Sequence, residues 1–242
     1  MRRYLPDLGT AIRLTVVLMV VTGILYPLAV TGIAQALFND RANGSLLKQD
    51  GQVIGSSLIG QSFTVDRYFH GRPSATLDTS PTPNPLPYNA GNSAASNLGP
   101  TNPTLIAQVQ SNADAVRCLE GLPPGPPPVV APTPGATPAP ATEAAPAAAT
   151  ATPAPCAAVR QDVNEVPVDA VTASGSGLDP DISITYARIQ VPRIAQARGL
   201  SEDQVQKLID DNILDRQLGV LGERRVDVLR LNLALDKLGG GQ

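Results

Sequence analysis

The feature that most limits how this chain can fold is a run of 25 residues without a charged side chain, from Leu14 to Phe38. As an α-helix the run would extend about 37 Å, which is enough to cross a membrane hydrocarbon core of ~30 Å. Three arginines but only one aspartate precede it, in residues 1–13. The positive-inside rule therefore predicts a cytoplasmic N-terminus, a single transmembrane helix at 14–38 and an extracytoplasmic remainder.

A cleaved signal peptide is the alternative, because Ala34-Gln35-Ala36 fits the small-x-small pattern of cleavage sites. The apolar part of a signal peptide normally spans about 7–15 residues, and this run is longer. We therefore expect an uncleaved anchor in the cell membrane.

Small and helix-perturbing residues interrupt the large apolar side chains of the run. Gly23, Pro27 and Thr31 are the principal ones. Small residues let a second helix approach closely, so we predict that this face packs against another membrane helix. The alternative is that they carry no function, because Gly and Pro are frequent in membrane helices.

The composition excludes several classes of function. A single histidine, His70, and two cysteines make a zinc site or a nucleophile–histidine pair improbable. The formal net charge of -3 and the lack of a long basic run argue against a nucleic-acid partner. No acidic cluster has the spacing of a cation site, so we expect no catalytic residue and no resident metal or cofactor.

A low-complexity insert divides the part beyond the membrane. Residues 119–155 hold 12 of the 24 prolines and 11 alanines, a composition typical of an extended, disordered linker. It separates a first half, 39–118, from a second half, 156–242. We expect the two halves to share one core, since neither is rich in aromatic residues.

The two cysteines stand at the edges of this insert. In an oxidising compartment, a structural disulfide between Cys118 and Cys156 would close the insert as a loop. Two unrelated buried thiols are the alternative.

The first half combines a hairpin, a long loop and a helix. Asp50-Gly51 between two short apolar runs predicts a β-hairpin over 46–55. The stretch 70–103 lacks periodicity and predicts a loop, and a helix follows over 103–118, capped by Asn102.

The second half is mainly helical. Asp179-Pro180 predicts a helix start, with a kink at Pro192 and an end at Gly199. A further helix opens at Ser201. The tail 226–238 fits a strand or a helix, and we favour a helix. The fold class is α+β: one N-terminal transmembrane helix and an extracytoplasmic α+β domain that the insert interrupts.

Several longer stretches are specific in sequence. They are 55–61 (GSSLIGQ), 68–75 (YFHGRPSA), 96–103 (SNLGPTNP), 171–179 (VTASGSGLD) and 231–236 (LNLALD). With the preceding membrane helix, they resemble the KdpC family, the C subunits of bacterial Kdp potassium-transporting P-type ATPases. The resemblance covers nearly the whole chain except the insert.

The resemblance implies a single-pass subunit of a complex that imports potassium at the expense of ATP. The implied partners are the potassium-conducting subunit KdpA, the ATP-hydrolysing subunit KdpB, the small subunit KdpF and membrane lipid. It also implies roles in assembly and in raising the ATP affinity of the hydrolytic subunit. The chain departs from the family pattern at 92–95, at Asp181 and in the extra insert, which affects the expected loop geometry.

Two stretches carry the candidate contact residues. We predict that Tyr68 and Phe69 anchor a loop and that Arg72 binds carboxylate or carbonyl groups, so that this loop and Asn97 form a partner interface. The segment Ser174–Gly177 lacks the lysine of a phosphate-binding loop and is better interpreted as a tight turn.

Gln204 is the one candidate for a nucleotide-linked residue. Leu200-Ser-Glu-Asp-Gln204 is similar to the Leu-Ser-x-x-Gln signature of ABC transporters. Ser201 and Gln204 also have the spacing of a helix capping box, and the predicted topology places them away from cytoplasmic ATP. The leading prediction is a non-catalytic subunit of a potassium import complex. The alternative is a membrane-anchored extracellular binding or stalk protein, with the insert as its spacer.

Overall fold

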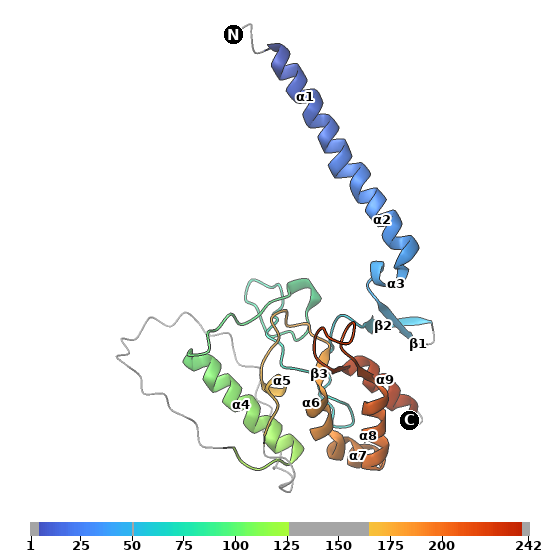
Figure 1. Cartoon of the computed structure of the whole chain (residues 1–242). Helices are drawn as coiled ribbons and strands as arrows, with labels where there is room; N and C mark the ends of the chain where they lie inside the picture. Colours follow the sequence, from blue (N-terminus) through green and yellow to red (C-terminus); the bar gives the residue numbers. More distant parts are fainter. Residues whose placement is uncertain (1–4, 50, 126–164, 239–242) are drawn as a thin grey trace, which may run out of the picture. The chain divides into compact units, whose positions relative to one another are not determined.

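A computed structural model describes residues 5–49, 51–125 and 165–238, and the chain divides into two units, Met1–Ser56 and Ser57–Gln242 (Figure 1). Helices and short strands both occur, which confirms the α+β class with one N-terminal apolar helix.

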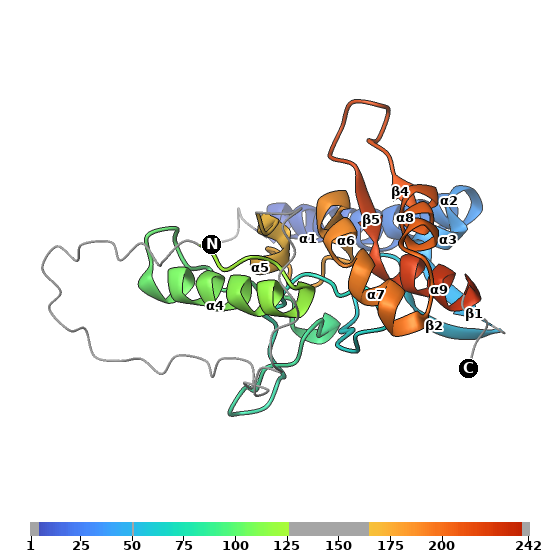
Figure 2. The same ribbon diagram turned by 90° about the horizontal axis from the view of Figure 1, so that it is seen from below.

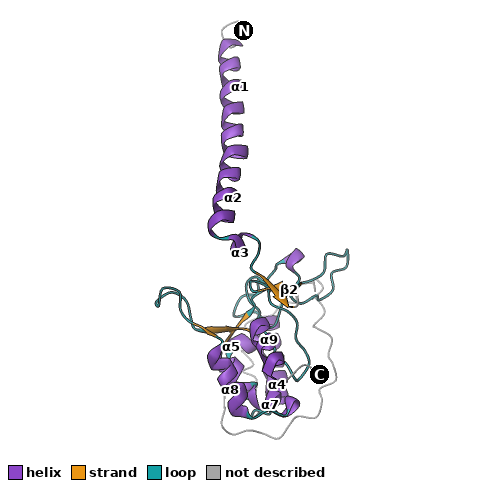
Figure 3. Cartoon of the chain, turned by 90° about the vertical axis from the view of Figure 1, so that its right-hand side faces the viewer, coloured by secondary structure: helices purple, strands orange, loops and turns teal. Residues whose placement is uncertain are grey.

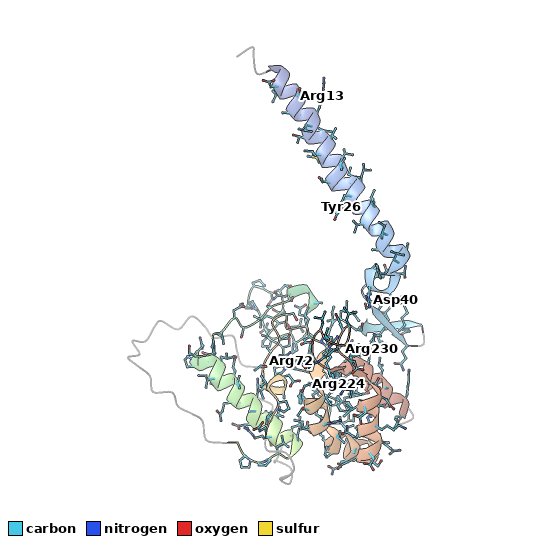
Figure 4. All side chains as sticks on the ribbon, in the orientation of Figure 1. Arg13, Tyr26, Asp40, Arg72, Arg224 and Arg230 are labelled. Atoms are coloured by element: carbon cyan, nitrogen blue, oxygen red, sulfur yellow. The ribbon has the colours of Figure 1, made fainter. Side chains whose placement is uncertain are left out.

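The first unit begins with the apolar helix. It runs through α1 (Leu5–Val20), a π-helical turn η1 (Val21–Leu25) and α2 (Tyr26–Leu37). The stretch Asp7–Leu37, 31 residues, is long and apolar enough to cross a membrane. Figure 4 shows its side chains projecting from the ribbon on every side. The predicted long apolar helix is confirmed.

The apolar helix contains a π-helical turn that was not predicted from the sequence. The Tyr26 N–H donates to the carbonyl of Val21, five residues back. A regular α-helix would bring the ring of Pro27 against the carbonyl four residues earlier, that of Gly23. The wider turn places Gly23 within η1 and Pro27 in the first turn of α2. Thr31 lies farther along α2. Packing of these residues against another membrane helix stays a prediction.

A β-hairpin closes the first unit, after the short helix α3 (Asn39–Ala42). Strands β1 (Leu46–Gln49) and β2 (Gln52–Ser56) pair antiparallel, with Gln49 opposite Gln52. Gly51 has a φ of 80°, as expected of a glycine in a tight hairpin turn. The predicted hairpin is confirmed, although Asp50 lies outside the described residues.

The second unit consists of helices around a small sheet (Figures 2 and 3). Its elements are η2 (Ala90–Asn92), α4 (Pro103–Glu120), α5 (Val168–Val171), β3 (Asp181–Ser183), α6 (Ile184–Ile189), α7 (Val191–Arg198), α8 (Glu202–Asp211), β4 (Ile213–Leu214), β5 (Arg225–Asp227) and α9 (Val228–Leu238). The three strands are antiparallel in the order β3-β5-β4.

One hydrophobic core serves both halves of this unit. Most of its side chains come from α6 to α9 and the sheet, Phe69 joins them from the first half, and Leu122 joins them from the segment just after α4. Val109, Ala113 and Val116 of α4 pack against the same core. The expectation of a shared core is therefore confirmed.

Helix α4 ends later than predicted. Asn102 caps its start, as expected, but the helix continues to Glu120 and ends at Gly121, whose φ is 65°. Glu120 and Leu122 are buried. Residues 119–122 therefore belong to the folded domain and not to the insert, because a buried cap anchors them.

Residues 126–164 lie outside the described part of the chain, and they include most of the insert. Cys118, in the last turn of α4, is disulfide-bonded. Its expected partner, Cys156, is not among the described residues, so this pairing stays a prediction.

The predicted helix start at Asp179 is wrong. Residues 181–183 form strand β3, and the helix begins only after Ser183, whose side chain accepts from the Tyr186 N–H. Pairing of β3 with β5 extends the backbone where local sequence favoured a helix. The predicted break near Pro192 is present: α6 ends at Ile189 and α7 starts with Pro192 in its first turn.

Three other predictions from local sequence hold. Gly199 ends α7 with a φ of 65°. Ser201 and Gln204 form the capping box that opens α8. The tail is helical from Val228 onward, with the preceding Arg225–Asp227 in strand β5.

The Ser174–Gly177 turn is built into the fold. The carbonyl of Gly177 accepts from the Ser74 hydroxyl at 2.7 Å, and that of Ser176 accepts from the Ala94 N–H at 3.1 Å. Gly177 has a φ of 68°, and a Cβ there would lie 2.5 Å from Thr76 Cγ2 and 2.7 Å from the Ala94 carbonyl oxygen. This close approach requires glycine.

We predict that Gly177→Ala lowers the free energy of unfolding by about 2 kcal/mol or more, since it combines a left-handed backbone with a clash against backbone. Gly175→Ala is the matched control, because a Cβ at Gly175 meets nothing within 4 Å. Urea unfolding of the two detergent-solubilised variants measures the difference. Equal midpoints would show that the turn is not tightly packed.

Candidate functional site

The candidate site centres on residues 66–72, an irregular segment that contains three of the predicted interface residues. Phe69 is fully buried in the core, with 0% of its surface exposed. Its aromatic ring anchors the segment, as predicted. Because it is buried, any contribution of Phe69 to a partner interface would act through the position of the loop and not by direct contact.

Two buried side-chain amides bind the backbone of this segment. The Asn232 amide accepts from the Phe69 N–H at 2.8 Å and donates to the Phe69 carbonyl at 3.0 Å. The Gln190 amide accepts from the His70 N–H at 2.8 Å and donates to the His70 carbonyl at 3.2 Å. Each amide thus satisfies a donor and an acceptor of one residue, as a neighbouring β-strand would. We call this pair the amide clamp.

Arg193 connects the amide clamp to α4. Its Nη2 donates to the Gln190 amide oxygen at 2.8 Å, and its Nη1 donates to the carbonyls of Asp66 and Tyr68. Its Nε lies 2.9 Å from a carboxylate oxygen of Glu120, and both side chains are almost wholly buried. Removing one partner of such a pair would leave an uncompensated buried charge. The pair therefore joins the end of α4 to α7 and to the 66–72 segment.

Tyr68 lies at the edge of the site. Its hydroxyl donates to Asp236 at 3.2 Å, and the Arg198 guanidinium lies 4.8 Å from the centre of its ring. Arg198 also pairs with Asp236 at 2.7 Å. The ring is therefore oriented by a cation–π contact and by a hydrogen bond to α9.

Arg72 holds the other end of the segment. It pairs with Asp179 at 2.9 Å and donates to the Thr172 carbonyl at 3.4 Å. Its own carbonyl accepts from the Tyr88 hydroxyl at 2.7 Å. The predicted carboxylate and carbonyl contacts of Arg72 are thus present, and they lie within the chain.

Tyr88 requires two glycines beside it. A Cβ on Gly71 would lie 2.4 Å from the Tyr88 hydroxyl, and one on Gly60 would lie 2.4 Å from its ring. Tyr88 itself has a φ of 60°, which is uncommon for a bulky residue. Burial, followed by the charge of Asp179, raises the pKa of Tyr88 to about 12, so its hydroxyl remains a hydrogen-bond donor at neutral pH.

His70 is neutral in this arrangement. Burial, and secondly the positive charge of Arg193, lower its pKa to about 4. Its Nε2 lies 3.3 Å from the Val65 carbonyl oxygen. The described residues contain no group of three or more His, Cys, Asp or Glu that could hold a metal ion.

The remaining predicted residues, Asn97 and Gln204, form their side-chain hydrogen bonds with residues close to them in sequence and not with this cluster. Asn97 has a φ of 54° and donates to the Ala95 carbonyl in its own turn. The Gln204 side chain accepts from the N–H and the hydroxyl of Ser201. These bonds account for Gln204 as a helix cap.

Gln190, Arg193 and Glu120 hold the site together, but no local pattern in the sequence predicted a role for them. Gln190 is the residue at which α6 gives way to α7, and Glu120 is the last residue of α4. Asn232 and Asp236 lay within the specific closing stretch 231–236 but had no assigned role. Their four-residue spacing, which places both on one face of a C-terminal helix, could have indicated that they act together.

Nearly the whole chain is similar to one family of known proteins. A family model described as "KdpC: K+-transporting ATPase, c chain" matches residues 8–130 and 131–237. A protein of Rhodopseudomonas palustris is 46% identical over 236 residues, covering 96% of this chain and 98% of its own length. Proteins of Mycobacterium tuberculosis (46% over 237 residues) and Methylobacterium nodulans (45% over 240 residues) each cover 98% of this chain and 99% of their own length. All three are named potassium-transporting ATPase KdpC subunit.

We predict that acid destabilises the fold through His70. Between pH 6.5 and about 4 the unfolded chain binds a proton that the folded chain excludes, so the free energy of unfolding falls as the pH falls. At about 1.4 kcal/mol per pKa unit, the loss would reach about 3 kcal/mol at pH 4.

Urea unfolding between pH 4 and 7 measures this slope, with His70→Gln as the non-titrating control. The variant should lose the part of the slope that His70 causes. If the free energy of unfolding changed with pH equally in both proteins, His70 would not be the group that causes the slope.

Proposed function

Since the chain belongs to the KdpC family, we propose that it is a non-catalytic subunit of a complex that uses ATP to import potassium. The match of the family model and of relatives over nearly the whole chain carries this proposal. The relatives are named as ATPase subunits, and the role without catalysis is our inference. In this proposed role, the amide clamp and the buried Arg193–Glu120 pair keep the domain rigid, so that its surface can bind partner subunits.

The proposed placement follows from charge and hydropathy. The apolar helix anchors the subunit in the cell membrane, and the arginines before it favour a cytoplasmic N-terminus. The domain formed by residues 57–242 would then be extracytoplasmic. In that compartment a disulfide between Cys118 and Cys156 would be stable.

We propose KdpA, KdpB and KdpF as the partners. The helix face with Gly23, Pro27 and Thr31 would pack among their membrane helices, where small residues allow close approach. The edge of the 66–72 segment with Tyr68, together with Asn97, would contact the extracytoplasmic side of the complex. In this proposal Arg72 positions the loop through Asp179.

An effect on ATP use would be indirect. We propose that the subunit raises the ATP affinity of KdpB through coupling within the complex, because ATP is cytoplasmic while the domain is proposed to lie outside. ATP and potassium then belong to the other subunits. The role of Gln204 in its capping box supports a structural assignment for that residue.

Affinity purification tests the proposal. We expect the tagged full-length chain, extracted in mild detergent from potassium-starved cells, to retain the potassium-conducting and hydrolytic subunits in a stable ratio. Mass spectrometry of the purified material identifies them. Recovery of the chain alone, while potassium uptake proceeds normally without it, would refute the proposal.

A deletion within the same experiment separates the transport role from that of a stalk. Removing residues 126–154 spares the buried Glu120 and Leu122 and both cysteines. We expect the shortened chain to retain the partners and to support growth at limiting potassium. A stalk protein would instead lose its function with its spacer.

Substitutions at Gln204 test the indirect effect on ATP. Gln204→Ala removes the acceptor for the Ser201 N–H and should cost about 1 kcal/mol or less of stability. Gln204→Glu keeps an acceptor at this position and should leave stability nearly unchanged. We expect the ATP KM of the complex to be unchanged in both. A raised KM in the stable Gln204→Glu variant would show a direct nucleotide role.

A further inference from the structure

The connection between β4 and β5 carries apolar side chains into solvent. Residues 215–224, which we call the arm, are all exposed, and they stand away from the helices in Figures 2 and 3. At the tip, Leu218 is 89% exposed, Val220 72% and Leu221 56%. Loops in contact with water usually end in polar residues, so this tip is a candidate contact surface.

Three successive cross-links hold the arm in one conformation. Asp215 pairs with Arg224 at 3.0 Å, and Arg216 pairs with Glu223 at 2.8 Å. Beyond them, the backbones of Gln217 and Leu221 exchange two hydrogen bonds of 2.9 Å. Exposed ion pairs contribute little singly, but this ladder aligns both sides of the arm. The tip is therefore pre-organised, which lowers the entropy cost of binding.

Leu218 is held in a strained conformation. Its φ is 53°, a left-handed region in which glycine is favoured, and the neighbouring Gly219 and Gly222 occupy the same region at 77° and 79°. With 89% of its surface exposed, the Leu218 side chain gains almost no packing energy from the described part of the chain. Strain of this kind occurs often at binding sites.

The charges of the arm argue against lipid as the occupant. Its two acidic and two basic side chains pair with one another, so it offers no net positive charge to anionic headgroups. A second copy of the chain is also disfavoured, because three side chains cover far less than the ~800 Å² per partner of a stable interface. An uncharged apolar crevice on a partner that is already tethered fits both observations, since tethering makes a small contact effective.

We propose that the tip, Leu218 to Leu221, inserts into an uncharged apolar crevice on the extramembrane surface of another subunit of the ATPase. This inference rests on the proposed function. It assigns the arm as an anchor of the domain, in addition to the apolar helix.

The test compares two variants of the full-length chain within the complex. Leu218→Asn combined with Val220→Ser removes the two most exposed apolar side chains of the tip, and asparagine tolerates the left-handed backbone at position 218. Val168→Ser is the matched control, because Val168 is 73% exposed on α5. We expect the tip variant to retain about tenfold less of the partner subunits after detergent washing, which corresponds to ~1.4 kcal/mol. The control should match the parent, and both variants should keep the parental urea midpoint.

Photo-crosslinking from position 220 identifies what the tip contacts. We expect an adduct with another subunit of the complex, and an adduct with lipid alone or with a second copy of this chain would overturn the inference. Full partner retention by the tip variant would also overturn it, while leaving the proposed function intact. If the parent chain retains no partner at all, the proposed function itself fails.

Discussion

An irregular backbone segment can lie in a protein core only where its N–H and carbonyl groups find partners, and residues 69 and 70 meet this condition through side-chain amides. Asn232 binds the backbone N–H and carbonyl of Phe69, and Gln190 binds those of His70, at distances of 2.8 to 3.2 Å. Leaving such groups unpaired would cost about 1–3 kcal/mol each. With them satisfied, Phe69 can be fully buried without a strand on either side.

This arrangement also unites the two halves of the domain. The 66–72 segment comes from the first half, and Gln190, Arg193 and Asn232 come from the second. The buried pair of Arg193 and Glu120 adds the end of α4, immediately before the proline-rich insert. The insert therefore leaves the domain at an anchored point, which accounts physically for how a fold tolerates a long extra segment there.

For a subunit that we propose to act without catalysis, this rigidity is the functional property. The titratable side chains near the clamp serve structure: His70 is kept neutral by burial and Arg193, and the Tyr88 hydroxyl remains a donor. The features that face outward are the apolar helix, the edge with Tyr68 and the arm with Leu218. In the proposed role these features would contact the partner subunits, while the polar networks inside hold the surface of the domain in shape.

Patterns between neighbours in the chain determined much of this protein. The uncharged run predicted the apolar helix, and Asp50-Gly51 predicted the hairpin. Asn102 and Ser201 predicted two helix starts, and the specific stretches predicted the family. Each depends on residues within a few positions of one another. The tertiary structure decided the rest, because its partners are distant in sequence. Pairing with β5 turned residues 181–183 into a strand, and burial carried α4 through Glu120. Asn232 reaches Phe69 across 163 positions, a contact that exists only once α9 has packed on the core.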